Sequence, residues 1–147
     1  MSLPYDGGYQ CGAVRYQITG EPVVVYVCHC TTCQTQSGSA FGLAARFPKE
    51  HFKLTRGALA SFEYPGTQGH SFSNSFCQNC GTRIHHVHSR FPNLVSLKPG
   101  TLDDAGWLRP ELHVFTRSAQ PWVMIPDDVP AYETMPEDRS IFGGRKT

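Results

Sequence analysis

The stretch Cys28-His29-Cys30-Thr31-Thr32-Cys33 places three thiols within six residues. A second group, Cys77-Gln78-Asn79-Cys80-Gly81, follows about half a chain later, and Cys11-Gly12 lies near the start. These six are all the cysteines of the chain. Thiols at C-x-C-x-x-C and C-x-x-C spacing can turn their sulfurs towards one point, and Zn²⁺ takes sulfur ligands at roughly 2.3 Å in a tetrahedron. The cysteine pattern therefore predicts a zinc protein.

Composition and charge exclude several other classes of protein. The chain has 147 residues, which is the usual length of one domain, and its formal net charge is +1 from 13 basic and 12 acidic residues. This balance gives no reason to expect binding to nucleic acid or to a membrane surface. With 14 Gly, 11 Pro and only 17% charged residues, the composition favours a turn-rich β protein over a helical bundle.

Whether the six cysteines bind metal or form disulfides depends on the cellular compartment of the protein. No apolar run is long enough to span a membrane, and residues 1–8 have neither a charged region nor an apolar core of a signal peptide. We therefore expect a cytoplasmic protein, in which thiols stay reduced and bind metal in preference to forming disulfides. A disulfide framework is the alternative for an exported protein.

Alternating and β-branched runs predict a mainly β fold of short antiparallel strands. The strands are expected at residues 13–19, 23–27, 40–47, 51–55, 60–64, 71–76, 82–88, 94–97 and 112–116. A single helical turn is expected at residues 31–36, with Gly38 ending it, and a short helix at residues 103–108. In such a fold, cysteines that are distant in sequence can meet at strand ends and turns.

Five motifs in order along the chain resemble the glutathione-dependent formaldehyde-activating enzyme family, which also includes the centromere protein V domain. They are Gly7 to Tyr16, Cys28 to Gln34, Ser37 to Phe41, Phe76 to Thr82, and His113 to Thr116 continued by Pro121-Trp122. The resemblance covers residues 5–132 as one domain, which leaves residues 133–147 as a C-terminal tail whose last five residues are expected to fray. It implies a single-domain β-tent fold and a zinc-dependent carbon–sulfur lyase acting on a thiol–aldehyde adduct such as S-hydroxymethylglutathione.

The resemblance also implies one or two zinc ions per chain. Its structural site would take Cys11, Cys77 and Cys80, and its catalytic site Cys28, Cys30 and Cys33. The family's first strand usually reads Gly-x-Cys-x-Cys-Gly, and here Tyr9 stands in place of the first cysteine. A phenol titrates near 10 and is a poor zinc ligand. Either another group closes the structural site, or this site binds zinc weakly, or it is empty.

The chemistry of the Cys28 motif allows more than one interpretation. Three thiolates and an open position are the pattern of a catalytic zinc, and the open position suits a substrate thiol, with glutathione implied by the resemblance. One alternative is a structural site whose fourth ligand lies elsewhere. Another is a four-cysteine ribbon of Cys30, Cys33, Cys77 and Cys80. In these cases the chain would be a non-catalytic, zinc-stabilised β module that binds a protein or a small ligand.

Other residues are candidates for supporting roles. His29 or His113 could serve as a general base. Further candidates are His86 and His88 on one strand face, Arg46 for a substrate carboxylate, and the turn Ser37-Gly38-Ser39 for an anion, although surface or structural roles explain these residues equally well. Trp107 and Trp122 are expected in the core or in a pocket wall. Exposed β edges permit a homodimer.

Overall fold

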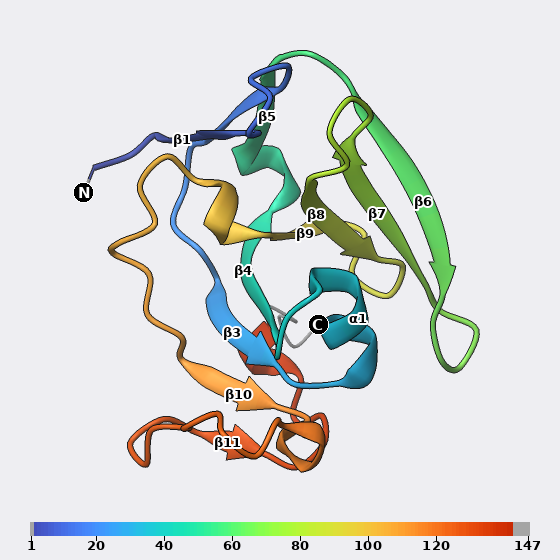
Figure 1. The fold of residues 1–147 in the computed structure, drawn as a ribbon, viewed down its shortest axis with the longest axis vertical. Coiled ribbons are helices and arrows are strands. Elements are labelled where there is room, and N and C mark those ends of the chain that lie inside the picture. The colour runs from blue at the N-terminus through green and yellow to red at the C-terminus, as the bar shows by residue number, and fades with distance from the viewer. Residues whose placement is uncertain (1, 143–147) are drawn as a thin grey trace.

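The computed structural model describes residues 2–142 and consists mainly of two β-sheets (Figure 1). The strands are β1 (Tyr5–Gly8), β2 (Arg15–Ile18), β3 (Val24–Cys28), β4 (Gly42–Pro48), β5 (Phe52–Arg56), β6 (Leu59–Pro65), β7 (Ser71–Cys77), β8 (Arg83–His88), β9 (Leu94–Leu97), β10 (Leu112–Val114) and β11 (Ala131–Tyr132). The small sheet has the order β1-β2-β5, and the large sheet has the order β11-β10-β3-β4-β9-β8-β7-β6. The predicted mainly β fold is confirmed.

Helical segments are few and short. They are α1 (Thr31–Ser37) and the 3₁₀ turns η1 (Lys49–His51), η2 (Pro99–Thr101), η3 (Thr116–Ser118) and η4 (Ser140–Phe142). Helix α1 begins after Cys30, whose sulfur accepts a hydrogen bond from the Cys33 N–H at 3.3 Å. It ends at Gly38, whose φ of 61° lies in the left-handed region that glycine adopts without strain. The predicted helical turn is thus confirmed and is one residue longer.

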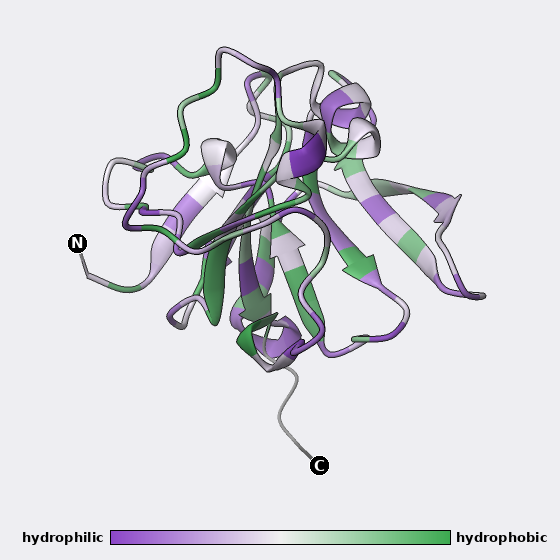
Figure 2. Cartoon of the chain, turned by 90° about the horizontal axis from the view of Figure 1, so that it is seen from below, coloured by the Kyte–Doolittle hydropathy of each residue, from purple (hydrophilic) through white to green (hydrophobic). Residues whose placement is uncertain are grey.

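The core lies on both faces of the central strands. All five residues of β3 are buried, as expected for a β-branched and aromatic run in the middle of a sheet. One core cluster includes Tyr16, Phe47 and Leu97, and the other includes Tyr26 and Val114 on the opposite face. Figure 2 shows hydrophobic residues along these central strands, alternating with more hydrophilic ones.

Not every strand pair is antiparallel. Strand β10 runs parallel to β3, and β11 runs parallel to β10. Parallel neighbours that follow one another in the chain need a long connection, and residues 115–130 supply one between β10 and β11. The expectation of antiparallel strands therefore fails at this edge and holds for the other strand pairs of the described residues.

The helix expected at residues 103–108 is absent, and that prediction is wrong. Instead, the Asp104 carboxylate accepts a hydrogen bond from the Gly106 N–H at 2.9 Å, and its backbone carbonyl accepts one from Trp107 Nε1 at 3.0 Å. An Asp side chain that bonds the backbone two residues on forms a turn that competes with helix. Strands β1 and β11 were not anticipated from the sequence pattern.

The C-terminal part of the described chain packs against the large sheet. Phe142 is only 4% exposed, and its ring meets the ring of Tyr26 edge to face at 5.1 Å between centroids. Arg46 donates to the Phe142 carbonyl oxygen at 3.1 Å. The expected fraying of residues 143–147 lies outside the described residues, and the domain boundary at residue 132 stays a prediction.

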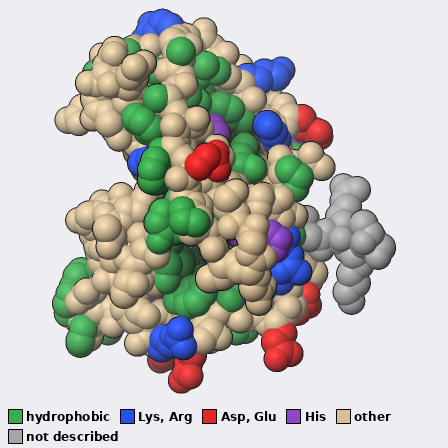
Figure 3. All heavy atoms as spheres, turned by 90° about the vertical axis from the view of Figure 1, so that its right-hand side faces the viewer, with side chains coloured by type: hydrophobic (Ala, Val, Ile, Leu, Met, Phe, Trp, Pro, Cys, Tyr) green, Lys and Arg blue, Asp and Glu red, His purple; other side chains and the backbone are tan. Residues whose placement is uncertain are grey.

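The surface seen in Figure 3 carries acidic and basic side chains scattered singly, with no broad patch of one sign. This agrees with the nearly neutral net charge of the chain. Among residues 2–142, no helix has the length and apolar character needed to cross a membrane.

Candidate metal centre

The Cys28 cluster, formed by Cys28, Cys30 and Cys33, lies where β3 meets α1. Cys28 is the last residue of β3, Cys30 caps the helix, and Cys33 lies in its first turn. The three Sγ atoms all lie within 4.8 Å of one another. Two sulfurs bound to one tetrahedral zinc ion lie about 3.8 Å apart, given bonds of about 2.3 Å. The three side chains therefore fit a metal ion of this kind.

The Cys11 cluster, formed by Cys11, Cys77 and Cys80, joins the turn after β1 to the turn between β7 and β8. Its sulfurs also lie within 4.8 Å of one another, and the Cys11 and Cys77 Sγ atoms are 3.6 Å apart. Cys77 is buried, whereas Cys11 and Cys80 are exposed. The structure thus keeps Cys30 and Cys33 apart from Cys77 and Cys80, and the alternative four-cysteine ribbon is wrong.

Within residues 2–142, neither cluster is closed by a fourth protein ligand of the usual type. Among residues 2–142, no further His, Cys, Asp or Glu atom joins the Cys28 cluster or the Cys11 cluster. Each arrangement therefore offers three sulfur ligands and leaves one tetrahedral position to another group.

Hydrogen bonds within the Cys28 cluster divide the protons unequally among the thiols. Bonds with Cys28 and then Cys33 lower the pKa of Cys30 to about 2, and the bonds to Cys30 and Cys33, together with burial, raise the pKa of Cys28. At Cys33 the bond with Cys28 lowers the pKa, but the bond to Cys30 and burial outweigh it and raise the pKa to about 11. A bound cation would compete with protons for all three sulfurs.

Hydrogen bonds also shift the pKa of a thiol in the Cys11 cluster. A hydrogen bond between Thr82 Oγ1 and the Cys80 sulfur, at 3.2 Å, and a backbone bond from Thr82 lower the pKa of Cys80 to about 6. Tyr9 differs, because burial and then the charge of Cys77 raise its pKa and keep the phenol neutral. Its buried hydroxyl has no hydrogen-bond partner among the described residues. Tyr9 therefore fills core space beside the cluster without supplying a fourth anionic ligand.

The candidate general bases His29 and His113 form a buried pair. His29 Nε2 lies 2.9 Å from His113 Nδ1, and the two rings stack with centroids 5.2 Å apart. Burial lowers the pKa of both, and the charge of His113 lowers that of His29 further. Neutral imidazoles can share this hydrogen bond, since one nitrogen donates and the other accepts. His29 lies between Cys28 and Cys30 in the chain, so the pair holds the cysteine loop against β10.

Other predicted residues have mostly structural surroundings. Arg46 is 7% exposed and is not a solvated surface arginine, because it donates to Ser96 Oγ at 3.2 Å and to the Phe142 carbonyl. Trp107 stacks on Tyr5 with centroids 4.5 Å apart. In contrast to the expected core or wall position, Trp122 is 71% exposed.

The remaining candidates are the histidines of β8 and the turn after α1. Neither His86 nor His88 belongs to a metal-ligand group of the described residues. In the turn, Ser37 Oγ donates to the carbonyls of Gln34 and Phe41, which is a structural use of its hydroxyl.

Lys98 was not predicted from the sequence as a residue near either cluster. It is half-buried, and the charges of Cys33, Cys28 and Cys30 act on it, so it lies near the Cys28 cluster. The only feature of the sequence that could have indicated this position is that Lys98 follows Ser96 by two residues, the spacing of side chains on one face of a strand.

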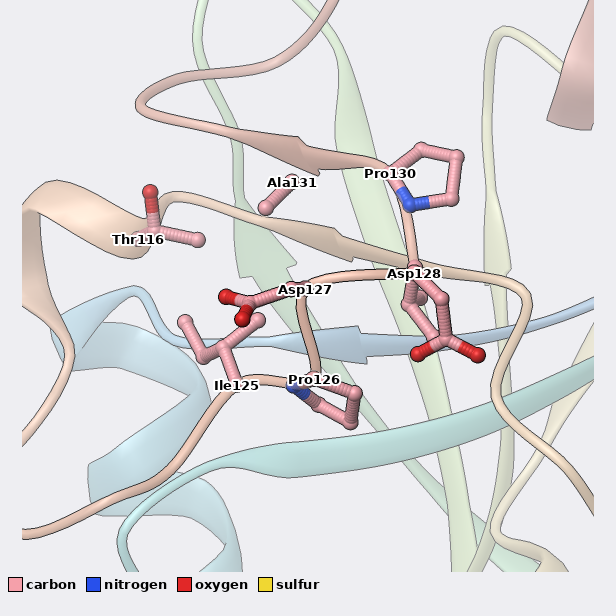
Figure 4. Close-up of a pocket in the computed structure, with 8 residues that line it drawn as sticks. Thr116, Ile125, Pro126, Asp127, Asp128, Pro130 and Ala131 are labelled. Atoms are coloured by element: carbon pink, nitrogen blue, oxygen red, sulfur yellow. The ribbon is translucent and has the colours of Figure 1, made fainter.

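A hollow of ≈ 610 Å³ lies elsewhere, between Thr116 and the loop of residues 125–131 (Figure 4). Asp127 and Asp128 contribute carboxylates to its wall. The Asp127 carboxylate is directed towards the part of the hollow where Thr116 lies. No cysteine lines this hollow, so it is separate from the two candidate metal sites.

Comparison with known proteins gives two similarities. The family model described as glutathione-dependent formaldehyde-activating enzyme matches residues 4–118. A crystal structure of a Rhodobacter sphaeroides protein matches with a TM-score of 0.54 and 23% sequence identity, over 71% of this chain and 91% of that chain. The second similarity is one of fold. The matched family region contains all six cysteines of both clusters.

Proposed function

Because the chain belongs to the glutathione-dependent formaldehyde-activating enzyme family, we propose that it is a zinc-dependent carbon–sulfur lyase acting on a thiol–aldehyde adduct such as S-hydroxymethylglutathione. The observation that carries this proposal is the Cys28 cluster, in which three sulfurs converge and no fourth ligand comes from the part of the chain that the structure describes. Three protein ligands and one open position are the usual arrangement of a catalytic zinc, whereas structural zinc is normally closed by four.

In this reaction a thiol sulfur forms a bond to the aldehyde carbon, and the thiol proton ends on the aldehyde oxygen. The reverse direction breaks the same carbon–sulfur bond and releases thiol and aldehyde. Zinc held by Cys28, Cys30 and Cys33 would supply a Lewis acid that lowers the pKa of the substrate thiol and polarises the aldehyde oxygen.

The surrounding residues orient the three ligands. The His29 N–H donates to the Val114 carbonyl at 3.0 Å, and the His29 carbonyl accepts from Gln34 Nε2 at 2.8 Å. The same Gln34 amide donates to the Ser118 carbonyl at 2.9 Å. Together with the His29–His113 bond, these contacts hold the cysteine loop between β10, α1 and η3. Such support around metal ligands reduces the reorganisation needed when metal and substrate bind.

We assign the Cys11 cluster a structural role as a second zinc site. It connects the turn that follows β1, in the small sheet, to the turn between β7 and β8, in the large sheet. Since Tyr9 supplies no thiolate, a water or another neutral group would complete its coordination, and we expect weaker binding there than in a four-cysteine site.

The test combines zinc content with turnover. We expect zinc-loaded protein to form or cleave S-hydroxymethylglutathione, and Cys30→Ser to lose both this activity and one zinc ion. Cys80→Ser is the matched control, because Cys80 is exposed and belongs to the other cluster; it should keep the activity. If folded Cys30→Ser turned over the adduct as fast as the wild type, the lyase proposal would be wrong. A specific protein partner, found together with no turnover of any thiol adduct, would instead support the non-catalytic module.

A further inference from the structure

One face of the large sheet carries a group of four basic side chains, here called the cation cluster. Its members are Arg46, Arg83, His86 and Lys98. In the strand register Arg46 of β4 lies opposite Ser96 of β9, Ser96 lies opposite His86 of β8, and His86 lies opposite Asn74 of β7. Since paired residues share a face, these side chains form one row across four strands.

The same face leads to the Cys28 cluster. Gly42 and Ala44 lie on the Arg46 face of β4, because alternate residues of a strand point to the same side. Gly42 pairs with Cys28, and Ala44 pairs with Tyr26. Lys98 follows Ser96 by two residues, which brings it level with Ala44 of β4 and so closer than Ser96 to the level of Gly42 and Cys28. A two-residue step along a strand is about 7 Å.

Electrostatic contacts agree with this register. The charges of Arg46, Arg83 and Lys98 all act on His86, and the charge of Cys33 acts on both Lys98 and Arg83. On the thiol side, Lys98 in turn lowers the pKa of Cys33. The cation cluster and the Cys28 cluster are therefore neighbours on one face.

The basic side chains nearest to the thiols have no acidic partner among the described residues. Among residues 2–142, no carboxylate forms an ion pair with Lys98 or Arg83. Arg83 donates through one terminal nitrogen to Asn74 Oδ1, but its buried Nε has no acceptor. Burial lowers the pKa of both Lys98 and Arg83. A charge removed from water without a counter-ion is costly, and an anion bound between the two side chains would offset this cost.

Arg46 has a different role. Its guanidinium is already bonded to Ser96 Oγ and to the Phe142 carbonyl, and it lies over the rings of Tyr26 and Phe91 at 5.7 and 5.6 Å from their centroids. It adds positive charge to the face, and two of its donors are already bonded within the fold.

We propose that Lys98 and Arg83 form an anion-binding subsite for a carboxylate carried by the thiol substrate, whose sulfur occupies the Cys28 cluster. This inference rests on the proposed function for the position of the sulfur. It makes the two residues determinants of specificity, since they select thiols with an acidic group several bonds away from the sulfur. The carboxylate is anchored while the sulfur reacts, so the adduct is held at two points.

The experiment measures binding, which is independent of turnover. Zinc-loaded protein is titrated calorimetrically with ω-mercaptoacids of increasing chain length and with the ω-mercaptoalcohol of each length. We expect the acids to bind at least about tenfold more tightly than the alcohols, as for a charge-assisted hydrogen bond, with a maximum at one chain length. Lys98→Met should abolish this preference, because it should weaken binding of the acids much more than binding of the alcohols. Lys53→Met, at an exposed position of β5, is the matched control and should keep the preference.

The possible outcomes separate the two proposals. Equal binding of acids and alcohols, or an unchanged preference in folded Lys98→Met, would overturn the subsite. So would binding of hexanoate as tight as that of mercaptohexanoate, because the anion would then bind without the thiol. If Lys98→Met does not fold, Lys98→Gln and Arg83→Gln replace it and should each reduce the preference. A Lys98-dependent preference without turnover of any adduct would support the subsite and refute the lyase. Turnover without the preference would do the reverse.

Discussion

Replacing Gly42 by alanine tests how closely helix α1 must sit on β4 for the Cys28 cluster to keep its geometry. A Cβ atom at Gly42 would lie 3.1 Å from the Cys33 Cβ and 3.4 Å from its sulfur. Ordinary contacts between carbon atoms are about 3.5–4.0 Å, so Cys33 must move by about 0.4 Å or more. Metal–ligand distances tolerate only about ±0.2 Å. We therefore expect zinc affinity at this cluster to fall about tenfold, or about 1.4 kcal/mol.

The measurement is competition for zinc against a chromophoric chelator, with thermal unfolding recorded in parallel. Overpacking costs about 1–3 kcal/mol in total, so the variant should still fold. Gly100→Ala is the control, since a Cβ there meets no atom within 4 Å and its φ is not positive; it should bind zinc as the wild type does. Wild-type zinc affinity in Gly42→Ala would refute the reasoning, because it would mean that Cys33 is not constrained by β4.

Three further changes test the fold. Gly7→Ala would place a Cβ against the fully buried Tyr16 ring, so we expect the free energy of unfolding in urea to fall by about 3 kcal/mol. A decrease below about 1 kcal/mol would contradict this packing. Phe142→Ala should lower the free energy of unfolding by about 3–5 kcal/mol. The control Ile141→Ala, at a residue that is 37% exposed, should lower it far less. Equal decreases would refute the packing of the C-terminal segment against the sheet. Burial, followed by the nearby positive charges, lowers the pKa of His85 to about 4, below about 6.5 when unfolded. Its neutral form therefore stabilises the fold fully above about pH 6.5, and up to about 3 kcal/mol is lost as the pH falls towards 4. The stability of wild type relative to His85→Gln should decrease over that range, and a difference independent of pH would contradict the assignment.

The parts of the fold that follow from local pattern were predictable from the sequence. The β-branched run of residues 23–27 is β3, because its apolar side chains suit a strand that is buried on both faces. The spacing of Cys28, Cys30 and Cys33 indicated that their sulfurs could converge, whereas the grouping of Cys11 with Cys77 and Cys80 came from the family resemblance, because spacing alone left a four-cysteine ribbon open. Helix α1 followed from the same motif and from Gly38.

The remainder depends on contacts that a local pattern does not show. β1 was missed because two of its four residues are glycine, which has a low strand propensity. The direction of β10 was missed because alternation shows the buried face of a strand but not the partner beside it. Lys98 was missed for the same reason, since its role depends on Cys33, which is distant in sequence and is brought close by the sheet register.

The bond between Arg46 and the Phe142 carbonyl has a consequence for biosynthesis. The two residues are 96 positions apart in the chain. At a translation rate of about 5–20 residues per second, roughly 5 to 20 seconds separate their addition to the nascent chain. During this interval the Arg46 side chain lacks its carbonyl acceptor and the aromatic ring that later covers it. Strands β3 and β4 can pair early in synthesis. The face of these strands that Phe142 covers stays exposed until the last part of the described sequence has been made.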